Sequence, residues 1–231
     1  MSVESDVEVK IHKKEAQALN QGLHYRRMGI TKVDVNLPSI SKGKLAFVLY
    51  NVFTEEECKK YIKDSEKRGY ELALVNTGRG SVKAPDVRNN SRNMWDSKEE
   101  ANKILQRIKD YLPETWKRRK LVELNERLRF LRYDPGEYFK PHLDGYYMRE
   151  NGDKSYITVQ IYLNEEFEGG STTFLKSYGC EDGGEEVVPR TGSVLIFQHD
   201  ILHEGSKLIK GRKYAIRTDV MYEALEYDSS R

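Results

Sequence analysis

Residues 133–147 have the sequence YDPGEYFKPHLDGYY. The turn signal Asp134-Pro135-Gly136 precedes an aromatic run in which His142 and Asp144 are two residues apart. Alternate side chains of an extended segment project from the same face, so these two can point at one object. Imidazole and carboxylate are ligands of non-haem ferrous sites, where two histidines and one carboxylate leave positions open for substrate and oxygen. The stretch therefore predicts two of the three ligands of an iron site.

The third ligand has to come from a distant part of the chain. Of the five histidines, His12 and His24 lie in a polar N-terminal segment and are poor candidates. His199 and His203 remain, close together in SVLIFQHDILHEGS. Spacing alone does not choose between these two histidines.

A basic residue is expected after the third ligand, where it would hold an anionic cosubstrate. A site completed by His203 has two basic candidates, Lys213 and Arg217, whereas a site completed by His199 has Lys213. The two basic residues share strand parity, but four residues along a strand span about 13 Å. Both side chains therefore cannot bind one carboxylate.

The sequence on both sides of this stretch predicts the fold class. Upstream, KLAFVLYNVF (44–53) predicts a strand, Thr54 and Glu57 predict the start of a helix that ends at Gly69, and residues 97–113 predict a second helix. Because the helices precede most strands, we expect them to pack on one face of a β core. Short β runs separated by Gly-rich turns are typical of a sandwich or barrel, and from residue 127 onward they are RLRFLRY, SYITVQIYL, STTFL, EVVP, SVLIFQ and KYAIRTDVMY. The chain is thus expected to be mainly β with flanking helices.

Composition is that of an ordinary globular chain. Its 231 residues include 39 Lys and Arg and 37 Asp and Glu, and a net charge of +2 is too balanced to predict nucleic-acid binding. No secretory signal and no long apolar run are visible, so we expect a cytoplasmic protein without a membrane partner. We expect a polar tail or surface helix over residues 1–40 and a single domain over 41–231, with its β core at about 127–222. The oligomeric state is left open.

The segment 76–96 has no periodicity and is rich in Gly, Asn, Ser and Arg, which predicts a long loop of functional importance. Asn90 and Arg92 in this loop are candidates for substrate contacts. Tyr146 shares the parity of His142 and Asp144, so it is a candidate for the lining of a substrate pocket.

Four segments together resemble the prolyl 4-hydroxylase-like iron(II)- and 2-oxoglutarate-dependent dioxygenases: RYDPGEYFKPHLDG, ITVQIYLNEEFEGGSTTF, GSVLIFQHDILHEG and GRKYAIRTDVMY. The resemblance covers roughly residues 127–222, with a weaker likeness at 45–70. It implies a double-stranded β-helix, or jelly-roll, core. It also implies His203 of HEG as the third iron ligand and Lys213 of GRK as the residue that binds 2-oxoglutarate, with Tyr133 and, secondarily, Thr158 as further cosubstrate contacts.

The resemblance further implies Fe(2+), 2-oxoglutarate and O2, with ascorbate as a possible additional cofactor, and hydroxylation of an unactivated C–H bond. The first expected substrate is a prolyl residue of a peptide or protein. A free amino acid or another small molecule is the alternative, and a non-catalytic jelly-roll binding module is the alternative from another class. With Lys213 assigned to 2-oxoglutarate, we expect Arg217 to contact substrate, to support the metal ligands or to pair with Asp219. No catalytic residue beyond the metal ligands is predicted.

Overall fold

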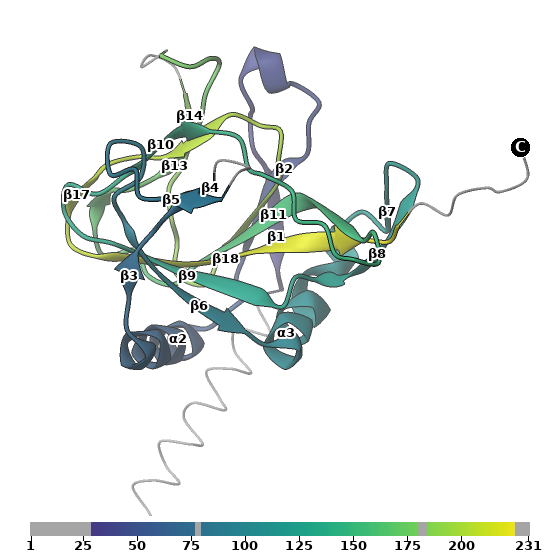
Figure 1. Cartoon of the computed structure of the whole chain (residues 1–231), viewed down its shortest axis with the longest axis horizontal. Helices are drawn as coiled ribbons and strands as arrows, with labels where there is room; N and C mark the ends of the chain where they lie inside the picture. Colours follow the sequence, from purple (N-terminus) through teal and green to yellow (C-terminus); the bar gives the residue numbers. More distant parts are fainter. Residues whose placement is uncertain (1–28, 77–79, 180–183, 225–231) are drawn as a thin grey trace, which may run out of the picture.

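The computed structural model describes residues 29–76, 80–179 and 184–224, and Figure 1 shows how its elements are arranged. The helical elements are η1 (Ser39–Ser41), α2 (Glu55–Arg68), α3 (Lys98–Ile108) and η2 (Lys109–Tyr111). The strands are β1 (Thr31–Asp34), β2 (Ala46–Tyr50), β3 (Glu71–Leu72), β4 (Val75–Asn76), β5 (Ser81–Val82), β6 (Ser91–Asp96), β7 (Thr115–Trp116), β8 (Arg119–Leu124), β9 (Arg127–Tyr133), β10 (Phe139–His142), β11 (Lys154–Tyr162), β12 (Glu168–Gly169), β13 (Thr172–Phe174), β14 (Glu185–Val187), β15 (Val194–Gln198), β16 (His203–Gly205), β17 (Leu208–Lys210) and β18 (Lys213–Tyr222). The expectation of a mainly β protein is confirmed.

The larger of the two principal sheets, the major sheet, is antiparallel. Its strand order is β1-β2-β15-β11-β18-β9-β6-β3, with β8 also paired to β18 and β7 to β8. The long strands β11 and β18 form its centre and pair from Lys154 and Tyr222 at one end to Tyr162 and Ala215 at the other. Strands β11, β15 and β18 are largely buried on both faces, because each face of the sheet is covered by another layer.

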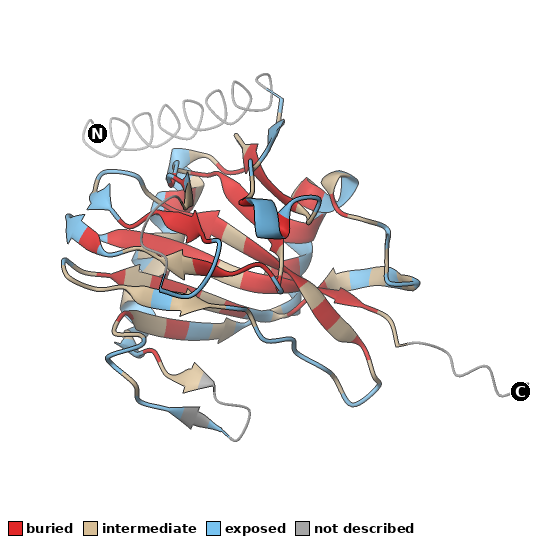
Figure 2. Ribbon diagram, turned by 90° about the horizontal axis from the view of Figure 1, so that it is seen from above, coloured by how far each residue is buried: buried red, intermediate tan, exposed pale blue. Residues whose placement is uncertain are grey.

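The second layer is the minor sheet, with strand order β10-β16-β13-β14. Its Phe174 and Val187 pack in one buried cluster with Val48, Leu195 and Phe197 of the major sheet. The rings of Phe174 and Phe197 meet edge to face at 5.3 Å. Figure 2 shows that the buried residues, in red, lie along the strands in the middle of the molecule. The two sheets thus form a sandwich with an apolar core, and the polar site described below lies beside that core.

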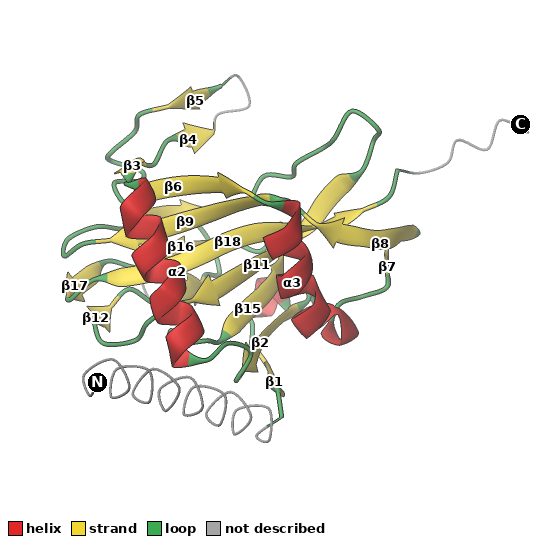
Figure 3. Ribbon diagram, turned by 90° about the horizontal axis from the view of Figure 1, so that it is seen from below, coloured by secondary structure: helices red, strands yellow, loops and turns green. Residues whose placement is uncertain are grey.

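Helices α2 and α3 lie across the major sheet on the side shown in Figure 3. Helix α2 starts with the predicted capping pair: the Thr54 hydroxyl accepts from the Glu57 amide at 3.2 Å, and the Glu57 carboxylate accepts from the Thr54 amide at 2.9 Å. Ile104 and Ile108 of α3 join the large buried cluster that also holds Phe130 of β9. Within the described part of the chain, the helices are too short or too polar to cross a membrane.

Two expectations about the N-terminal half need correction. The predicted tail over residues 1–40 is partly wrong, because Thr31–Asp34 forms β1 and pairs with β2 at the edge of the major sheet; residues 1–28 lie outside the described residues. The predicted loop over 76–96 is also partly wrong, because Ser91–Asp96 forms β6 and pairs with β9 along six residues. The polar sequence SRNMWD does not predict a strand, because β6 is stabilised by backbone hydrogen bonds to β9 and not by an apolar pattern of its own.

Candidate metal centre

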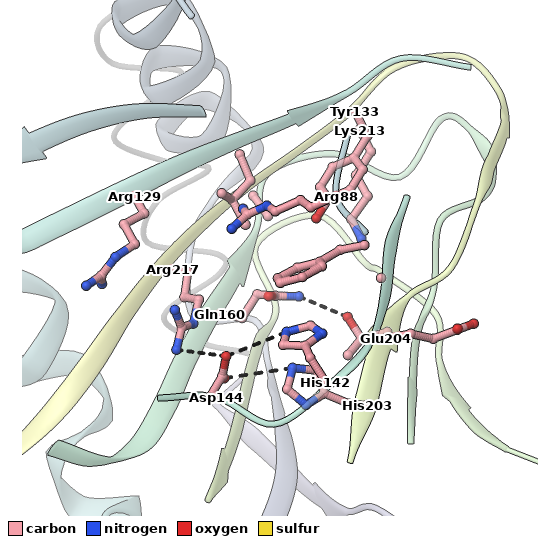
Figure 4. A pocket seen from close by; sticks show the side chains of 15 residues that line it. Arg88, Arg129, Tyr133, His142, Asp144, Gln160, His203, Glu204, Lys213 and Arg217 are labelled. Atoms are coloured by element: carbon pink, nitrogen blue, oxygen red, sulfur yellow. Dashed lines mark hydrogen bonds and ion pairs between the residues drawn. The ribbon is translucent and has the colours of Figure 1, made fainter. Parts of the chain in front are cut away.

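Three side chains from two distant segments of the chain converge between the two sheets. His142 ends β10, His203 begins β16, and the two histidines face each other as a cross-strand pair. Asp144 lies in the loop after β10, where its amide donates to the carbonyl of His199 at 3.0 Å. One potential ligand atom from each of His142, Asp144 and His203 lies within 4.8 Å of the other two, and Figure 4 shows them facing one another. Strand pairing and a single loop hydrogen bond therefore bring this group together.

The hydrogen bonds of the two imidazoles indicate which nitrogen is free. Nδ1 of His142 lies 2.8 Å from the carbonyl of Lys140, and Nδ1 of His203 lies 2.9 Å from the carbonyl of Ile201. A carbonyl only accepts, so each Nδ1 carries the proton and each Nε2 keeps its lone pair. The Nε2 atoms lie 3.7 and 3.8 Å from the two Asp144 oxygens, beyond hydrogen-bonding distance. Both lone pairs are thus available to a shared cation.

The ionisation states also suit a metal. Burial lowers the pKa of His142 to about 3 and lowers the pKa of His203, so both rings are neutral near pH 7. Burial acts to raise the pKa of Asp144, but the guanidinium of Arg217 and the two imidazoles outweigh it, and the pKa lies well below its usual range. Two neutral imidazoles and one carboxylate on one side of a buried space are a donor set that fits ferrous iron.

Asp144 is held in place by two neighbours on the major sheet. The hydroxyl of Thr158 on β11 donates to its Oδ2 at 2.6 Å, and Nη2 of Arg217 on β18 lies 3.0 Å from its Oδ1. The triad opens into a pocket that extends to Tyr133 and Lys213. Thr158, expected as a cosubstrate contact, donates to the Asp144 carboxylate instead and does not line this pocket. Such outer partners orient a carboxylate ligand.

Lys213 provides a buried cation on the far side of the pocket. Its ammonium donates to the carbonyl of Gly170 at 2.5 Å and lies 5.0 and 5.6 Å from the ring centroids of Tyr133 and Tyr162. Burial lowers the pKa of Lys213 to about 7. No carboxylate of the described residues pairs with it, so this lysine is suited to an anionic ligand that enters the pocket.

Arg217 adopts two of the roles expected for it, because it contacts Asp144 and also lies 3.2 Å from Oδ1 of Asp219. The same Asp219 accepts from Arg129 of β9 at 3.1 Å. His199 is buried beside them, with its Nε2 3.6 Å from Asp219 Oδ1. His199 therefore lies next to the buried ion pairs, outside the triad of His142, Asp144 and His203.

The candidate substrate residues are placed elsewhere than expected. Tyr146 is 61% exposed and lies under the ammonium of Lys154, because the strand ends at His142 and strand parity no longer applies. Asn90 is buried but accepts from Arg88, and Arg92 lies near Glu71, so neither lines the pocket. The sequence interpretation missed Arg88, which does line it. The available signal was the cation-rich segment 76–96, but its polar composition did not indicate which of its side chains points into the pocket.

A larger groove adjoins the pocket and shares Phe139, Glu204 and Gly205 with it. The groove has a volume of about 820 Å³ and extends past Lys140, Thr173 and Tyr178 on the minor sheet and its neighbouring loops. A continuous surface of this size can accept an extended polymer segment as well as a small molecule.

Comparison with known proteins agrees with this geometry. The 2OG-Fe(II) oxygenase superfamily matches residues 128–218. A probable prolyl 4-hydroxylase 10 of Arabidopsis thaliana is 30% identical over 206 residues, which cover 76% of this chain and 68% of the relative. Prolyl 4-hydroxylase 5 of the same plant is 28% identical over 206 residues, with the same two coverages of 76% and 68%.

Solved structures share the fold. A viral collagen prolyl hydroxylase from Paramecium Bursaria Chlorella virus-1, in a 2-oxoglutarate complex, superposes with a TM-score of 0.54 at 20% identity over 81% of this chain and 100% of its own. A Trichoplax adhaerens prolyl hydroxylase bound to a hypoxia inducible factor peptide fragment gives 0.55 at 17% identity over 91% of each chain. The expected double-stranded β-helix core is thereby confirmed. With the family match, the relative at 30% identity and a donor set that fits ferrous iron, the chain belongs to the 2OG-Fe(II) oxygenase superfamily as a prolyl 4-hydroxylase-like dioxygenase.

Proposed function

We propose that this chain hydroxylates a prolyl residue of a peptide or protein, with iron held by His142, Asp144 and His203 and 2-oxoglutarate held by Lys213 and Tyr133. The convergence of the three ligand side chains, with both Nε2 lone pairs free, is the observation that carries the proposal. The prolyl 4-hydroxylase relatives support the substrate, as does the peptide complex of the Trichoplax enzyme. The groove of about 820 Å³ beside the pocket is compatible with a polypeptide.

Each residue of the site has a task that its contacts suit. Bound ferrous iron, with 2-oxoglutarate and O2, supplies an oxidant strong enough for an unactivated C–H bond. Lys213 offers its ammonium to the distal carboxylate of 2-oxoglutarate, in a buried setting where a charge pair is strong. Thr158 and Arg217 hold the Asp144 carboxylate in one orientation. Leu131, Phe139 and Ala215 supply apolar walls that limit access of water.

The direct test is an anaerobic titration with Fe(II) and 2-oxoglutarate, followed by exposure to air. We expect a visible charge-transfer band on binding, and succinate together with a +16 product when a proline-containing peptide is present. His203→Ala should abolish both signals, whereas His199→Ala, a matched change four residues away, should retain the band. A band that survives loss of His203 and depends on His199 would contradict the ligand assignment. A band without succinate from any substrate would favour the non-catalytic binding module.

A cytoplasmic location and the absence of nucleic-acid and membrane partners remain predictions from the sequence. Fractionation of cells that produce the full chain tests the location, and recovery in a membrane or organelle fraction would contradict it.

A further inference from the structure

The pocket contains more positive charge than the iron ligands and 2-oxoglutarate account for. Four cationic side chains line it, namely Arg88, Arg129, Lys213 and Arg217. Two carboxylates in the described residues oppose them: Asp144 beside Arg217, and Asp219, which contacts both Arg129 and Arg217. The two positive charges of a ferrous ion cancel the two negative charges of 2-oxoglutarate. With these groups bound, the site therefore keeps a net charge of two positive units.

The other acidic residue along the wall does not change this balance. Glu204 follows His203 on β16, and successive side chains of a strand point to opposite faces. Its carboxylate accepts from the hydroxyl of Ser206, which in turn contacts Thr173 at 2.7 Å. Glu204 is thus engaged on the face of the minor sheet that points away from the metal ligands.

Arg88 is the least compensated of these cations. Its Nε donates to the amide oxygen of Asn90 at 2.7 Å, and no carboxylate in the described part of the chain pairs with its guanidinium. Burial lowers the pKa of Arg88 to about 10, which reflects a charge poorly compensated by its surroundings. Figure 4 shows Arg88 among the side chains that surround the pocket. A half-buried guanidinium that is held by Asn90 and has no carboxylate partner among the described residues is suited to an incoming anion.

The ring of Phe139 separates Arg88 from the metal-ligand candidate His142. The Phe139 ring stacks on the imidazole of His142 at 3.6 Å with an interplanar angle of 18°, so that face of the phenyl ring is occupied. The guanidinium of Arg88 lies 4.5 Å from the centroid of the same ring and therefore covers the opposite face. Phe139 thus stands between Arg88 and His142, so an anion that contacts this guanidinium lies on the other side of the ring from that metal ligand.

Strand register gives a second, independent sign of uncompensated charge. Arg217 of β18 lies directly opposite Arg129 of β9. Like charges directly opposite each other destabilise a sheet. Arg129 contacts Asp219, and Arg217 contacts both Asp219 and Asp144, but Nε of Arg217 is buried without a hydrogen-bond partner in the described residues. An additional anion in the pocket would relieve this repulsion.

We propose that the primary substrate carries a carboxylate close to the hydroxylated carbon, and that Arg88 binds this carboxylate, with Arg217 contributing to the favourable potential. The inference rests on the proposed hydroxylase function and specifies its substrate class. Such a carboxylate belongs either to the hydroxylated residue itself, at a free C-terminus or in a free amino acid, or to an acidic side chain next to the prolyl residue in a peptide.

Two matched pairs of probes separate these sources. N-acetyl-L-proline and N-acetyl-L-prolinamide differ in the terminal charge, and the peptides acetyl-Ala-Pro-Asp-Ala-amide and acetyl-Ala-Pro-Asn-Ala-amide differ in the neighbouring side chain. Binding is measured by calorimetry on the whole chain with Mn(II) in place of iron and saturating 2-oxoglutarate. In at least one pair we expect the carboxylate member to bind about tenfold more tightly or better, a difference of roughly 1.4 kcal/mol.

Variants test whether Arg88 is the receptor. Arg88→Gln should abolish the preference while the affinity for 2-oxoglutarate stays within about twofold, and Arg88→Lys, which retains the charge, should keep part of it. Arg132→Gln is the matched control, because Arg132 pairs with Glu66 outside the pocket and its loss should leave the preference unchanged. If Arg88→Gln does not fold, Arg88→Lys together with the probe pairs still decides the proposal.

Three results would overturn the inference: no carboxylate preference in either pair, a preference that persists in Arg88→Gln, or a loss of 2-oxoglutarate affinity in its place. Failure of the proposed function has a different signature, namely no succinate with any probe in aerobic assays with iron. Binding with Mn(II) does not require turnover, so it still decides whether the pocket selects a carboxylate.

Discussion

Side chains on β18 alternate between two environments, and this alternation separates packing residues from site residues. Tyr214 and Ile216 pack in the large cluster beneath the helices. The side chains between them, Lys213, Ala215 and Arg217, face the minor sheet and line the pocket. A polar residue at a position that faces the interior is costly to bury unless it has a partner. Polar groups at such positions are therefore the residue-scale signature of the site.

Lys213 illustrates the cost of such a group, and we predict that Lys213→Met stabilises the free protein while it weakens cosubstrate binding. The pKa of Lys213 is lowered from 10.5 to about 7, so the folded state carries an unfavourable charge below pH 7, and this penalty fades as pH rises toward 10.5. Near pH 7 the variant should gain about 2 to 4 kcal/mol in free energy of unfolding, measured with urea. It should lose at least about tenfold in 2-oxoglutarate affinity, since a charge-assisted contact contributes about 1.5–3 kcal/mol.

The control for this experiment is Lys210→Met. Lys210 is a largely exposed lysine on β17 that pairs with Glu168 at the surface. Its loss should change stability by less than about 0.5 kcal/mol and leave 2-oxoglutarate affinity unchanged. Equal effects of the two substitutions, or normal cosubstrate affinity in Lys213→Met, would remove Lys213 from the cosubstrate site and transfer the role to Arg217.

The same lysine predicts how 2-oxoglutarate affinity depends on pH. Below pH 7 the ammonium is already charged, whereas above it the site must take up a proton when the dianion binds. With metal saturating, the affinity should be nearly constant from pH 6 to 7 and fall by up to about tenfold per pH unit above that. Calorimetry at pH 8 in two buffers of different ionisation enthalpy should show proton uptake. Proton release, or no buffer dependence, would contradict the assignment.

Turns between elements are held by close backbone approach, and Gly192 is the clearest case. It adopts φ +76° in the turn before β15, and its amide donates to the carbonyl of Tyr162 while its own carbonyl accepts from Phe53. A Cβ placed there would lie 2.0 Å from the carbonyl oxygen of Phe53, a backbone atom that cannot move aside. The turn thus joins β15 to the segment that precedes α2.

We predict that Gly192→Ala destabilises the protein by more than about 4 kcal/mol or prevents folding, because a backbone clash adds to the cost of the left-handed conformation. Gly43→Ala is the control, since Gly43 has a similar φ of +83° and no atom within 4 Å of an added Cβ. It should cost only about 1–2 kcal/mol, the penalty of that conformation for an L-residue. Urea unfolding of the two variants measures the difference, and equal costs would show that close approach does not hold this turn.

At the scale of the whole molecule, the site depends on both sheets. His142 and His203 belong to the minor sheet, whereas Thr158, Lys213 and Arg217 belong to the major sheet. A metal bound by Asp144 and the two histidines, together with 2-oxoglutarate bound to Lys213, would link the layers through contacts that the unfolded chain cannot make. Ligand binding is therefore coupled to the stability of the sandwich.

We predict that Mn(II) and 2-oxoglutarate together stabilise the protein. A ligand present at one hundred times its dissociation constant adds about 2.7 kcal/mol to the free energy of unfolding, and excess chelator should reverse the gain. Thermal unfolding with each ligand alone and with both measures the effect. His203→Ala should show no shift with either ligand combination. A shift of the same size in that variant would mean that the ligands bind outside the proposed site.

Several elements of the fold can be predicted from the sequence, because they depend on residues that are close together in the chain. The short β runs KYAIRTDVMY and SVLIFQ indicate strands, and the Thr54 and Glu57 pair indicates the start of α2. The resemblance carried by HLDG and HEG named three side chains, His142, Asp144 and His203, that the structure brings close together. The strands and the helix start depend on neighbours a few residues apart, whose contacts the chain itself specifies. His203 was assigned by the resemblance, because local rules did not choose between His199 and His203.

Other features of the fold and the site depend on tertiary contacts, which local sequence patterns do not predict. Strand β6 is ordered by its pairing with β9, so its polar sequence does not reveal it. Tyr146 turned outward because β10 ends at His142, and Arg88 turned inward because Asn90 and Phe139 hold its guanidinium. The physical reason is common to these cases: loop side chains and polar strands take their positions from partners distant in the chain. The sequence by itself thus determined the β core and the kinds of ligand, and only the packed sandwich decided which cations line the pocket.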